Sequence, residues 1–201
     1  MSNFDLLIRN GTVATAADTF QADVAIKDGR VVALGHDLGT AEQEIDAAGK
    51  LLLPGGIEGH CHIEQISSSR VMTADDFYSG TVSAVFGGTT TVIPFAAQQK
   101  GDSLRQTVED YHACAGPKAV IDYGFHLIIS DPSDQVIGQE LPALIKDGYT
   151  SFKVYMTYDD LRLDDYQMLE VLSAARRDGA MVMVHAENHD MIRWLSENLL
   201  D

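Results

Sequence analysis

The regular alternation of short apolar strands with helical segments after residue 54 is the feature that most constrains the fold. Five segments rich in apolar and β-branched residues are expected to be strands: the stretch ending at residue 62, then 89–95, 121–129, 149–156 and 181–185. Helices are expected to begin near residues 73, 103, 134, 164 and 188. Strands separated by helices of this length form a parallel sheet with right-handed crossovers. A (β/α)₈ barrel has eight such units, so this α/β chain would supply the first five βα units.

Residues 1–53 show a different pattern, in which short strands are separated by tight turns. Asn10-Gly11 and Asp28-Gly29 each follow a short apolar segment, and both dipeptides are strong hairpin signals. We therefore expect a small antiparallel β unit over residues 1–53 and an incomplete barrel over residues 54–201. The first unit carries no cluster of residues that suggests catalysis, so its expected role is structural.

The charge balance limits the kinds of partner. Lys and Arg number 14 against 30 Asp and Glu, which gives a formal net charge of −16. Nucleic acids and anionic membranes require basic patches, so neither is expected as a partner. The two cysteines, Cys61 and Cys114, cannot form a disulfide framework. No signal peptide or long apolar run is recognisable, and together these features predict a soluble, cytoplasmic protein.

His60 and His62 end the first expected strand of the barrel. Residues i and i+2 of a strand point to the same face, so both imidazoles would project together, as two ligands of one metal ion must. Lys153, Tyr158 and His185 follow at or just beyond the ends of later strands. The carboxyl ends of parallel strands form the edge at which active sites lie. A His-x-His pair alone is equally compatible with two loop histidines, and the shared edge is what favours a metal site.

Lys153 lies among apolar and aromatic residues, in the stretch 151–156. A buried ammonium group is expensive unless it is paired, neutralised or chemically altered. One interpretation is a lysine with a buried stem and a charged head that reaches water. The other is a neutral amine that takes up carbon dioxide, which gives an anionic carbamate able to bridge two cations. His185 is also open to two interpretations, a hydrogen-bonded core histidine or a further metal ligand.

Four stretches carry a resemblance to a known family. They are Pro-Gly-Gly-Ile-Glu-Gly-His-Cys-His at 54–62, Phe-Tyr-Ser-Gly at 77–80 with Phe-Gly-Gly-Thr-Thr-Thr at 86–91, Phe-Lys-Val-Tyr-Met-Thr-Tyr at 152–158, and Val-His-Ala-Glu-Asn at 184–188. In this order and spacing they resemble the dihydropyrimidinase/D-hydantoinase family of cyclic amidohydrolases, within the amidohydrolase superfamily. The resemblance implies a metal-dependent (β/α)₈ TIM-type barrel and a small β-sandwich built from both chain ends. Residues 1–53 would be the N-terminal part of that sandwich.

The resemblance also implies the role of each site residue. His60 and His62 would bind the more buried of two divalent metal ions, of zinc type. A carboxylated Lys153, formed with carbon dioxide, would bridge the two ions, and His185 would bind the more exposed one. Tyr158 would hydrogen-bond the carbonyl of a small cyclic ureide or imide substrate and its developing oxyanion. The implied reaction is hydrolysis of the cyclic amide, from a 5-substituted hydantoin to an N-carbamoyl amino acid, by a hydroxide held between the metals.

The sequence departs from the family pattern in two ways. The family has a further metal histidine and a proton-shuttling aspartate on later barrel strands, which this chain does not reach. We therefore expect the N-terminal portion of a hydantoinase-like enzyme, inactive by itself. It would belong to a homo-oligomer (dimer or tetramer) of the complete protein or be completed by a second chain. Glu58, Gly59 and Cys61 replace residues common in relatives, and Cys61 is expected to point away from the metal side.

Three other functions compete with this interpretation. A dihydroorotase would have an arginine two residues after the second histidine, where this chain has Glu64. An allantoinase shares the metal pattern and stays open. A non-catalytic dihydropyrimidinase-related interaction protein would have lost its metal ligands, whereas this chain retains them. His126 lies on a strand that points to the same edge, but the sequence does not decide which face it occupies.

Overall fold

The computed structural model of the protein describes residues 3–66 and 71–199. The chain divides after Gly55 into two compact units, and each unit is described by itself. Within the described ranges, no helix combines the length and the apolar character needed to cross a membrane.

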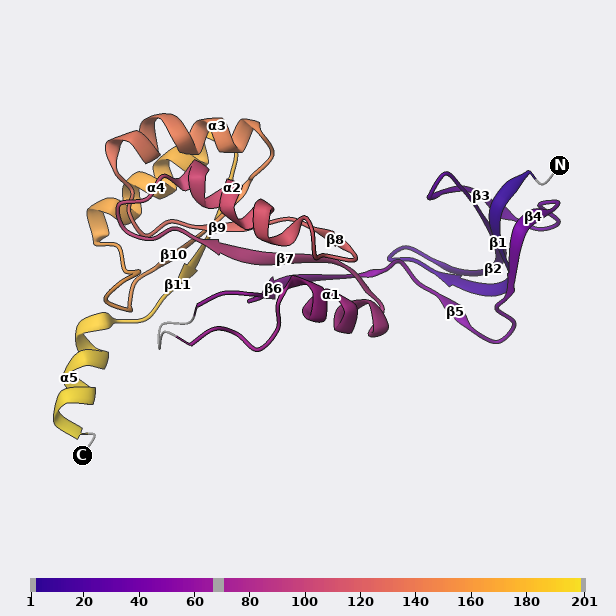
Figure 1. Ribbon diagram of the computed structural model, residues 1–201, viewed down its shortest axis with the longest axis horizontal. Helices are drawn as coiled ribbons and strands as arrows, with labels where there is room; N and C mark the ends of the chain where they lie inside the picture. The colour runs from indigo at the N-terminus through magenta and orange to yellow at the C-terminus, as the bar shows by residue number, and fades with distance from the viewer. Residues whose placement is uncertain (1–2, 67–70, 200–201) are drawn as a thin grey trace. The chain divides into compact units, whose positions relative to one another are not determined.

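The first unit is a five-stranded sheet that is mixed rather than wholly antiparallel. Its strands are β1 (Phe4–Ala14), β2 (Thr19–Lys27), β3 (Arg30–Gly35), β4 (Ala41–Asp46) and β5 (Leu51–Leu52). The sheet order is β3, β2, β1, β4, and β5 also pairs with β1 (Figure 1). β1, β2 and β3 pair antiparallel, whereas β4 and β5 run parallel to β1. The antiparallel prediction is therefore wrong for the last two strands, because the chain crosses from β3 to the free edge of β1 before β4 begins.

Asn10-Gly11 is a β-bulge within β1 and not the hairpin turn that its sequence predicts. β1 continues through both residues, and its pairing with β2 shifts between Ile8 and Gly11. Asn10 has a left-handed backbone, with φ 61°. Its N–H donates to Asp23 Oδ1 at 3.0 Å, and its side-chain amide donates to Asp46 Oδ1 at 3.0 Å. These partners are distant in the sequence, which explains why the local turn signal misleads.

The second expected hairpin is confirmed. Asp28 and Gly29 connect β2 to β3 as a two-residue loop, with Lys27 paired to Arg30. Both loop residues have positive φ, 51° and 71°, which is the combination that a type I′ turn needs.

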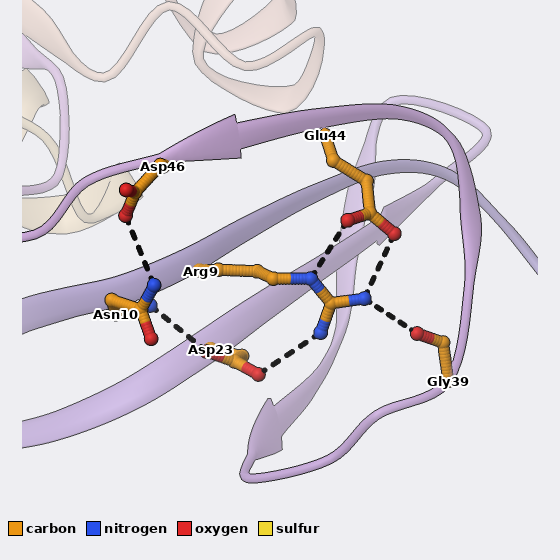
Figure 2. Close-up of polar contacts among 6 residues, drawn as sticks. All are labelled: Arg9, Asn10, Asp23, Gly39, Glu44 and Asp46. Atoms are coloured by element: carbon orange, nitrogen blue, oxygen red, sulfur yellow. Dashed lines mark hydrogen bonds and ion pairs between the residues drawn. The ribbon is translucent and has the colours of Figure 1, made fainter.

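Arg9 ties three strands of the first unit together, as Figure 2 shows. Its guanidinium donates twice to the Glu44 carboxylate, both at 2.8 Å, and once to the Gly39 carbonyl at 2.6 Å. A longer ion pair of 3.4 Å reaches Asp23. The hydrogen bonds between Arg9 and Glu44 raise the pKa of the arginine and lower the pKa of the carboxylate. Because these residues come from β1, β4 and β2, the network holds the parallel edge strand against β1.

Replacement of Asn10 by alanine is expected to destabilise the first unit by about 1–2 kcal/mol, because the left-handed conformation costs an ordinary residue that much. Asn10→Gly is the matched control. It loses the same hydrogen bond to Asp46 but accepts the backbone conformation, so its effect should be smaller. Hydrogen exchange of the β1 amides in increasing urea measures both effects, and equal losses in the two variants would contradict the backbone argument.

The second unit contains a parallel sheet whose main strands follow one another in chain order. Its elements are β6 (Gly56–Cys61), α1 (Phe77–Phe86), β7 (Thr89–Ala97), α2 (Leu104–Ala115), β8 (Asp122–Tyr123), β9 (His126–Ile128), η1 (Val136–Glu140), α3 (Leu141–Lys146), β10 (Ser151–Tyr155), α4 (Asp165–Asp178), β11 (Met181–His185) and α5 (His189–Leu199). The order is β6, β7, β9, β10, β11, all parallel, and the short β8 pairs with β7. The predicted strand–helix units are confirmed, although the strand expected at 121–129 is split into β8 and β9. A sheet that grows in one direction along the chain is typical of a barrel rather than of a doubly wound fold.

Helix boundaries differ from the expected ones at two places. α1 begins at Phe77 with an aspartate as its N-cap. It does not begin after Thr73, whose hydroxyl instead accepts a hydrogen bond from the Gln65 N–H. The helix expected over residues 134–146 is divided into the π-helical turn η1 and α3. The division falls where Pro142 lacks the N–H that a continuous α-helix would use.

The two faces of the parallel sheet have different coverings. One face packs against α1–α4 through a large apolar core that includes Leu127 and Phe152, and Figure 1 shows α2, α3 and α4 gathered together. The opposite face carries a small cluster of Phe95, Ile128 and Tyr155. Along each strand, side chains point in turn to the helix-covered core and to the opposite face, so every second side chain faces away from the helices.

Candidate metal centre

His60 and His62 project from the end of β6 onto the face opposite the helices. Their ring centroids are 5.9 Å apart, and both rings contact Phe95 of β7, at 4.8 and 5.1 Å. Cys61 packs against the helix-covered core, as alternation along a strand predicts. Burial raises the pKa of the Cys61 thiol to about 11, so this side chain is an unreactive packing group. The two histidines therefore share one face.

Lys153 lies on β10 with its amine against two aromatic rings. Nζ is 6.0 Å from the ring centroid of Phe95 and 5.2 Å from that of Tyr155, and the residue is 8% exposed. Within residues 3–66 and 71–199, no hydrogen bond or ion pair reaches this amine. A lysine that only buries its stem would keep its charged head in water. The residue as a whole is buried, but no described side-chain nitrogen or oxygen is both buried and without a hydrogen-bond partner, so the amine keeps contact with solvent and both interpretations of Lys153 stay open.

His185 and Tyr158 gather around the ring of Tyr155. His185 is the last residue of β11 and stacks on Tyr155, with a centroid distance of 5.5 Å and 23° between the ring planes. The Tyr158 ring lies 5.2 Å from His185 and 5.8 Å from Tyr155. His185 Nε2 pairs with the carboxylate of Glu187. This second group is thus built from the ends of β10 and β11.

Tyr158 has an unusual backbone. Its φ of 72° lies in the left-handed region, which bulky residues rarely adopt. Its carbonyl accepts hydrogen bonds from the N–H groups of Leu161 and Arg162, at 3.0 and 2.8 Å, so a tight turn after β10 imposes the conformation. Strain of this kind persists where the surrounding structure enforces it, and it is common at functional sites. The turn presents the Tyr158 ring, which is 44% exposed, beside His185.

Strand register explains why the two groups share one edge. His185 is paired with Tyr155, and Lys153 lies two residues earlier on the same strand. The Lys153 amine contacts Phe95, the ring of the histidine pair, and Tyr155, the ring of the His185 group. The structure therefore brings the five predicted site residues to one edge, as two groups that Lys153 links.

His126 is a residue whose face the sequence does not decide. It is buried on β9, and its ring is 5.2 Å from Phe95, on the site face. Nε2 donates to the Gly59 carbonyl at 3.0 Å, and Nδ1 accepts from the Ser151 hydroxyl at 2.6 Å. Burial lowers the pKa of His126, which keeps the ring neutral. Because both ring nitrogens are engaged, His126 braces the site rather than offering a ligand, and its apolar neighbours on both sides hide this role in the sequence.

The donor chemistry of this edge suits a divalent metal ion. Three imidazoles offer nitrogen ligands of the kind that zinc prefers, and the amine of Lys153 lacks a polar partner among the described residues. Over the same residues, no three His, Cys, Asp or Glu side chains converge as a ready-made cluster. A charged amine would repel cations, so a metal ion beside Lys153 is compatible with a neutral or an anionic form of this side chain and not with the ammonium.

An open hollow of about 740 Å³ adjoins Tyr158. It is lined by the turn after β10 and by residues near the start of α5, among them Thr157, Asp159, Glu187 and His189. A volume of this size is typical of sites for small molecules. The hollow gives a small substrate room next to Tyr158.

Known proteins with similar sequences and folds indicate the family of this chain. The amidohydrolase family model matches residues 51–198. The chain is 48% identical to the D-hydantoinase of Geobacillus stearothermophilus, over 97% of this chain and 42% of that protein. It is 43% identical to the dihydropyrimidinase of Rattus norvegicus, over 93% of this chain and 37% of that protein. The solved structure of a D-hydantoinase from Bacillus sp. AR9 has a TM-score of 0.92 at 46% identity, covering 98% of this chain and 43% of that one.

The chain belongs to the amidohydrolase family. Its fold is accordingly part of a (β/α)₈ barrel together with part of a β-sandwich, as predicted. Membership of this family implies a metal cofactor. The chain spans less than half the length of the curated relatives described above, 42% and 37%.

Replacement of Lys153 by methionine is expected to change the stability of the metal-free protein by less than about 1 kcal/mol, because the amine has no hydrogen bond or ion pair to other described residues that the change would remove. Lys146→Met, at the exposed end of α3, is the control for loss of a lysine at the surface. Urea unfolding without metal ions measures both. A loss of several kcal/mol specific to Lys153→Met would show a structural lysine and contradict this account of the amine.

Proposed function

We propose that the protein containing this chain hydrolyses the cyclic amide bond of hydantoins and dihydropyrimidines. The observation that carries the proposal is the position of the Lys153 amine, which links the histidine pair to the group around Tyr155. A carbamate formed on this amine is the anionic ligand that would join the two groups. The names of the relatives, D-hydantoinase and dihydropyrimidinase, support the same class of substrate.

Four side chains would hold two divalent metal ions, and zinc is the ion best suited to imidazole ligands of this kind. His60 and His62 would bind one ion, His185 would bind the other, and Lys153, carboxylated by carbon dioxide, would bridge them. When bound, the ions supply Lewis acidity and activation of water. To bind the ion through Nε2, His185 would give up the contact of this nitrogen with the Glu187 carboxylate.

Tyr158 is the residue we expect to act on the substrate. Hydrolysis adds water across the ring C–N bond, so the carbonyl carbon gains an oxygen and the nitrogen leaves with a proton. During this addition negative charge develops on the carbonyl oxygen, to which the Tyr158 hydroxyl would donate a hydrogen bond. Such donors contribute roughly 3 kcal/mol in other enzymes. Contacts with Tyr155 and His185 and the left-handed turn hold the ring in place for this role.

The activity is proposed for the whole protein, because the chain spans 42% of the hydantoinase it matches. By the family resemblance, a further metal histidine and a proton-shuttling aspartate would come from outside this chain. We also propose that the complete protein forms a homo-oligomer, or that a second chain completes the barrel. The cytoplasm is likewise proposed as its compartment, which fits the free state of Cys61 and Cys114.

The Tyr158→Phe variant of the full protein tests the catalytic role. We expect its kcat for ring opening to fall by about 10²–10³-fold, the loss seen when one oxyanion donor is removed. Its zinc content should stay that of the wild type, because Tyr158 is not a ligand. Tyr166→Phe, on the exposed surface of α4, is the matched control and should change neither quantity.

Three substrates separate the candidate activities. Steady-state assays would follow opening of a 5-substituted hydantoin, a dihydropyrimidine and allantoin by the zinc-loaded wild type. Turnover of the first two supports the proposal, and turnover of allantoin alone would replace it with the allantoinase alternative. A wild-type protein that binds zinc and opens none of the rings would contradict the enzymatic function.

A further inference from the structure

The side chain of Gln65 joins His62 to the neighbouring strand. Gln65 follows His62 by three residues and is 9% exposed. Its Oε1 lies 2.6 Å from His62 Nδ1, and its Nε2 donates to the Phe95 carbonyl at 3.3 Å. Both ends of the amide are therefore engaged, one with the imidazole and one with the backbone of β7.

This double contact fixes the position of a proton. A backbone carbonyl can only accept, so the amide end that faces Phe95 must be the NH₂ group. The end that faces His62 is then the amide oxygen, which carries no hydrogen. His62 Nδ1 must therefore carry a proton and donate it to Gln65, so that in the neutral ring the lone pair lies on Nε2.

The backbone around Gln65 is anchored independently of this contact. Gln65 and Thr73 exchange two hydrogen bonds, Gln65 N–H to Thr73 Oγ1 at 3.1 Å and Thr73 N–H to the Gln65 carbonyl at 3.0 Å. Glu64 has a left-handed backbone, with φ 48°. Its carboxylate accepts the Phe77 N–H at 3.0 Å, at the start of α1, and pairs with Lys118. These contacts fix the backbone that carries the Gln65 amide beside His62.

The other histidines of the site are held in different ways. Both nitrogens of His126 are engaged, and His185 uses Nε2 for Glu187. Within the described parts of the chain, no hydrogen bond reaches the ring of His60. Only His62 among these four shows one nitrogen held by a neutral side-chain oxygen and the other left with its lone pair. That is the arrangement in which protein groups orient a metal-ligating histidine.

We propose that Gln65 is a positioning residue that holds His62 as the Nδ1–H tautomer and presents Nε2 as the ligand atom of the metal centre. This inference rests on the proposed function for the metal itself. The tautomer, however, is a property of the metal-free protein, and it is therefore measured separately.

Nitrogen-15 NMR of the histidine rings in the metal-free protein tests the tautomer. The His62 signals are assigned by their loss in His62→Asn. We expect the wild type to show a protonated Nδ1, and Gln65→Met, which removes the acceptor, to shift His62 toward the Nε2–H form. Gln65→Glu loses the NH₂ donor to the Phe95 carbonyl but keeps an oxygen acceptor for the Nδ1 proton, and it should preserve the protonated Nδ1. A wild-type His62 protonated on Nε2, or a Gln65→Met spectrum like that of the wild type, would overturn the proposal.

Zinc titration then measures the consequence for the metal. Gln65→Met should weaken zinc binding by about 10–100-fold, the usual effect of losing a residue that orients a ligand, and Gln65→Glu should restore most of it. Gln98→Met removes a fully buried amide away from these histidines and is the control for general destabilisation. Equal weakening in Gln98→Met and Gln65→Met would contradict a specific role for Gln65. Absence of zinc uptake by the wild type would contradict the proposed function. The tautomer experiment would still show whether Gln65 holds the proton on His62 Nδ1.

Discussion

The amine of Lys153 is held against Phe95 and Tyr155 without a carboxylate to balance it. Among the described residues no hydrogen bond or ion pair reaches this amine, so its hydrogen bonds go to solvent at the edge of the sheet. Local departures from the usual pairing rules are expected at functional sites. The lysine is held in place by β10, whose flanking residues Phe152 and Val154 are both fully buried in the core on the other face.

Phe95 is the physical link between that amine and the rest of the edge. The residue is 1% exposed, its ring contacts His60 and His62, and its carbonyl accepts from Gln65. His126 packs against the same ring and is tied to Gly59 and Ser151. Candidate ligands from separate strands are therefore positioned by one buried side chain and a few hydrogen bonds.

The sequence predicts those features that depend on local periodicity. Period-two alternation places the two histidines on one face, the βα rhythm brings Lys153 and His185 to the same edge, and the Asp28-Gly29 turn forms as its residues indicate. Features set by distant partners are not predictable in this way. Asn10 becomes a bulge because of aspartates on other strands. The roles of His126 and Gln65 depend on the backbone carbonyls of other strands, to which a sequence gives no access.

Carbon-13 NMR of the protein incubated with zinc and ¹³C-bicarbonate tests most directly whether this edge is a metal centre built on an altered Lys153. We expect one carbamate signal that appears with both additions and is lost in Lys153→Met. A protein that binds zinc tightly with no carbamate signal, or a signal that survives in Lys153→Met, would contradict the proposed metal centre.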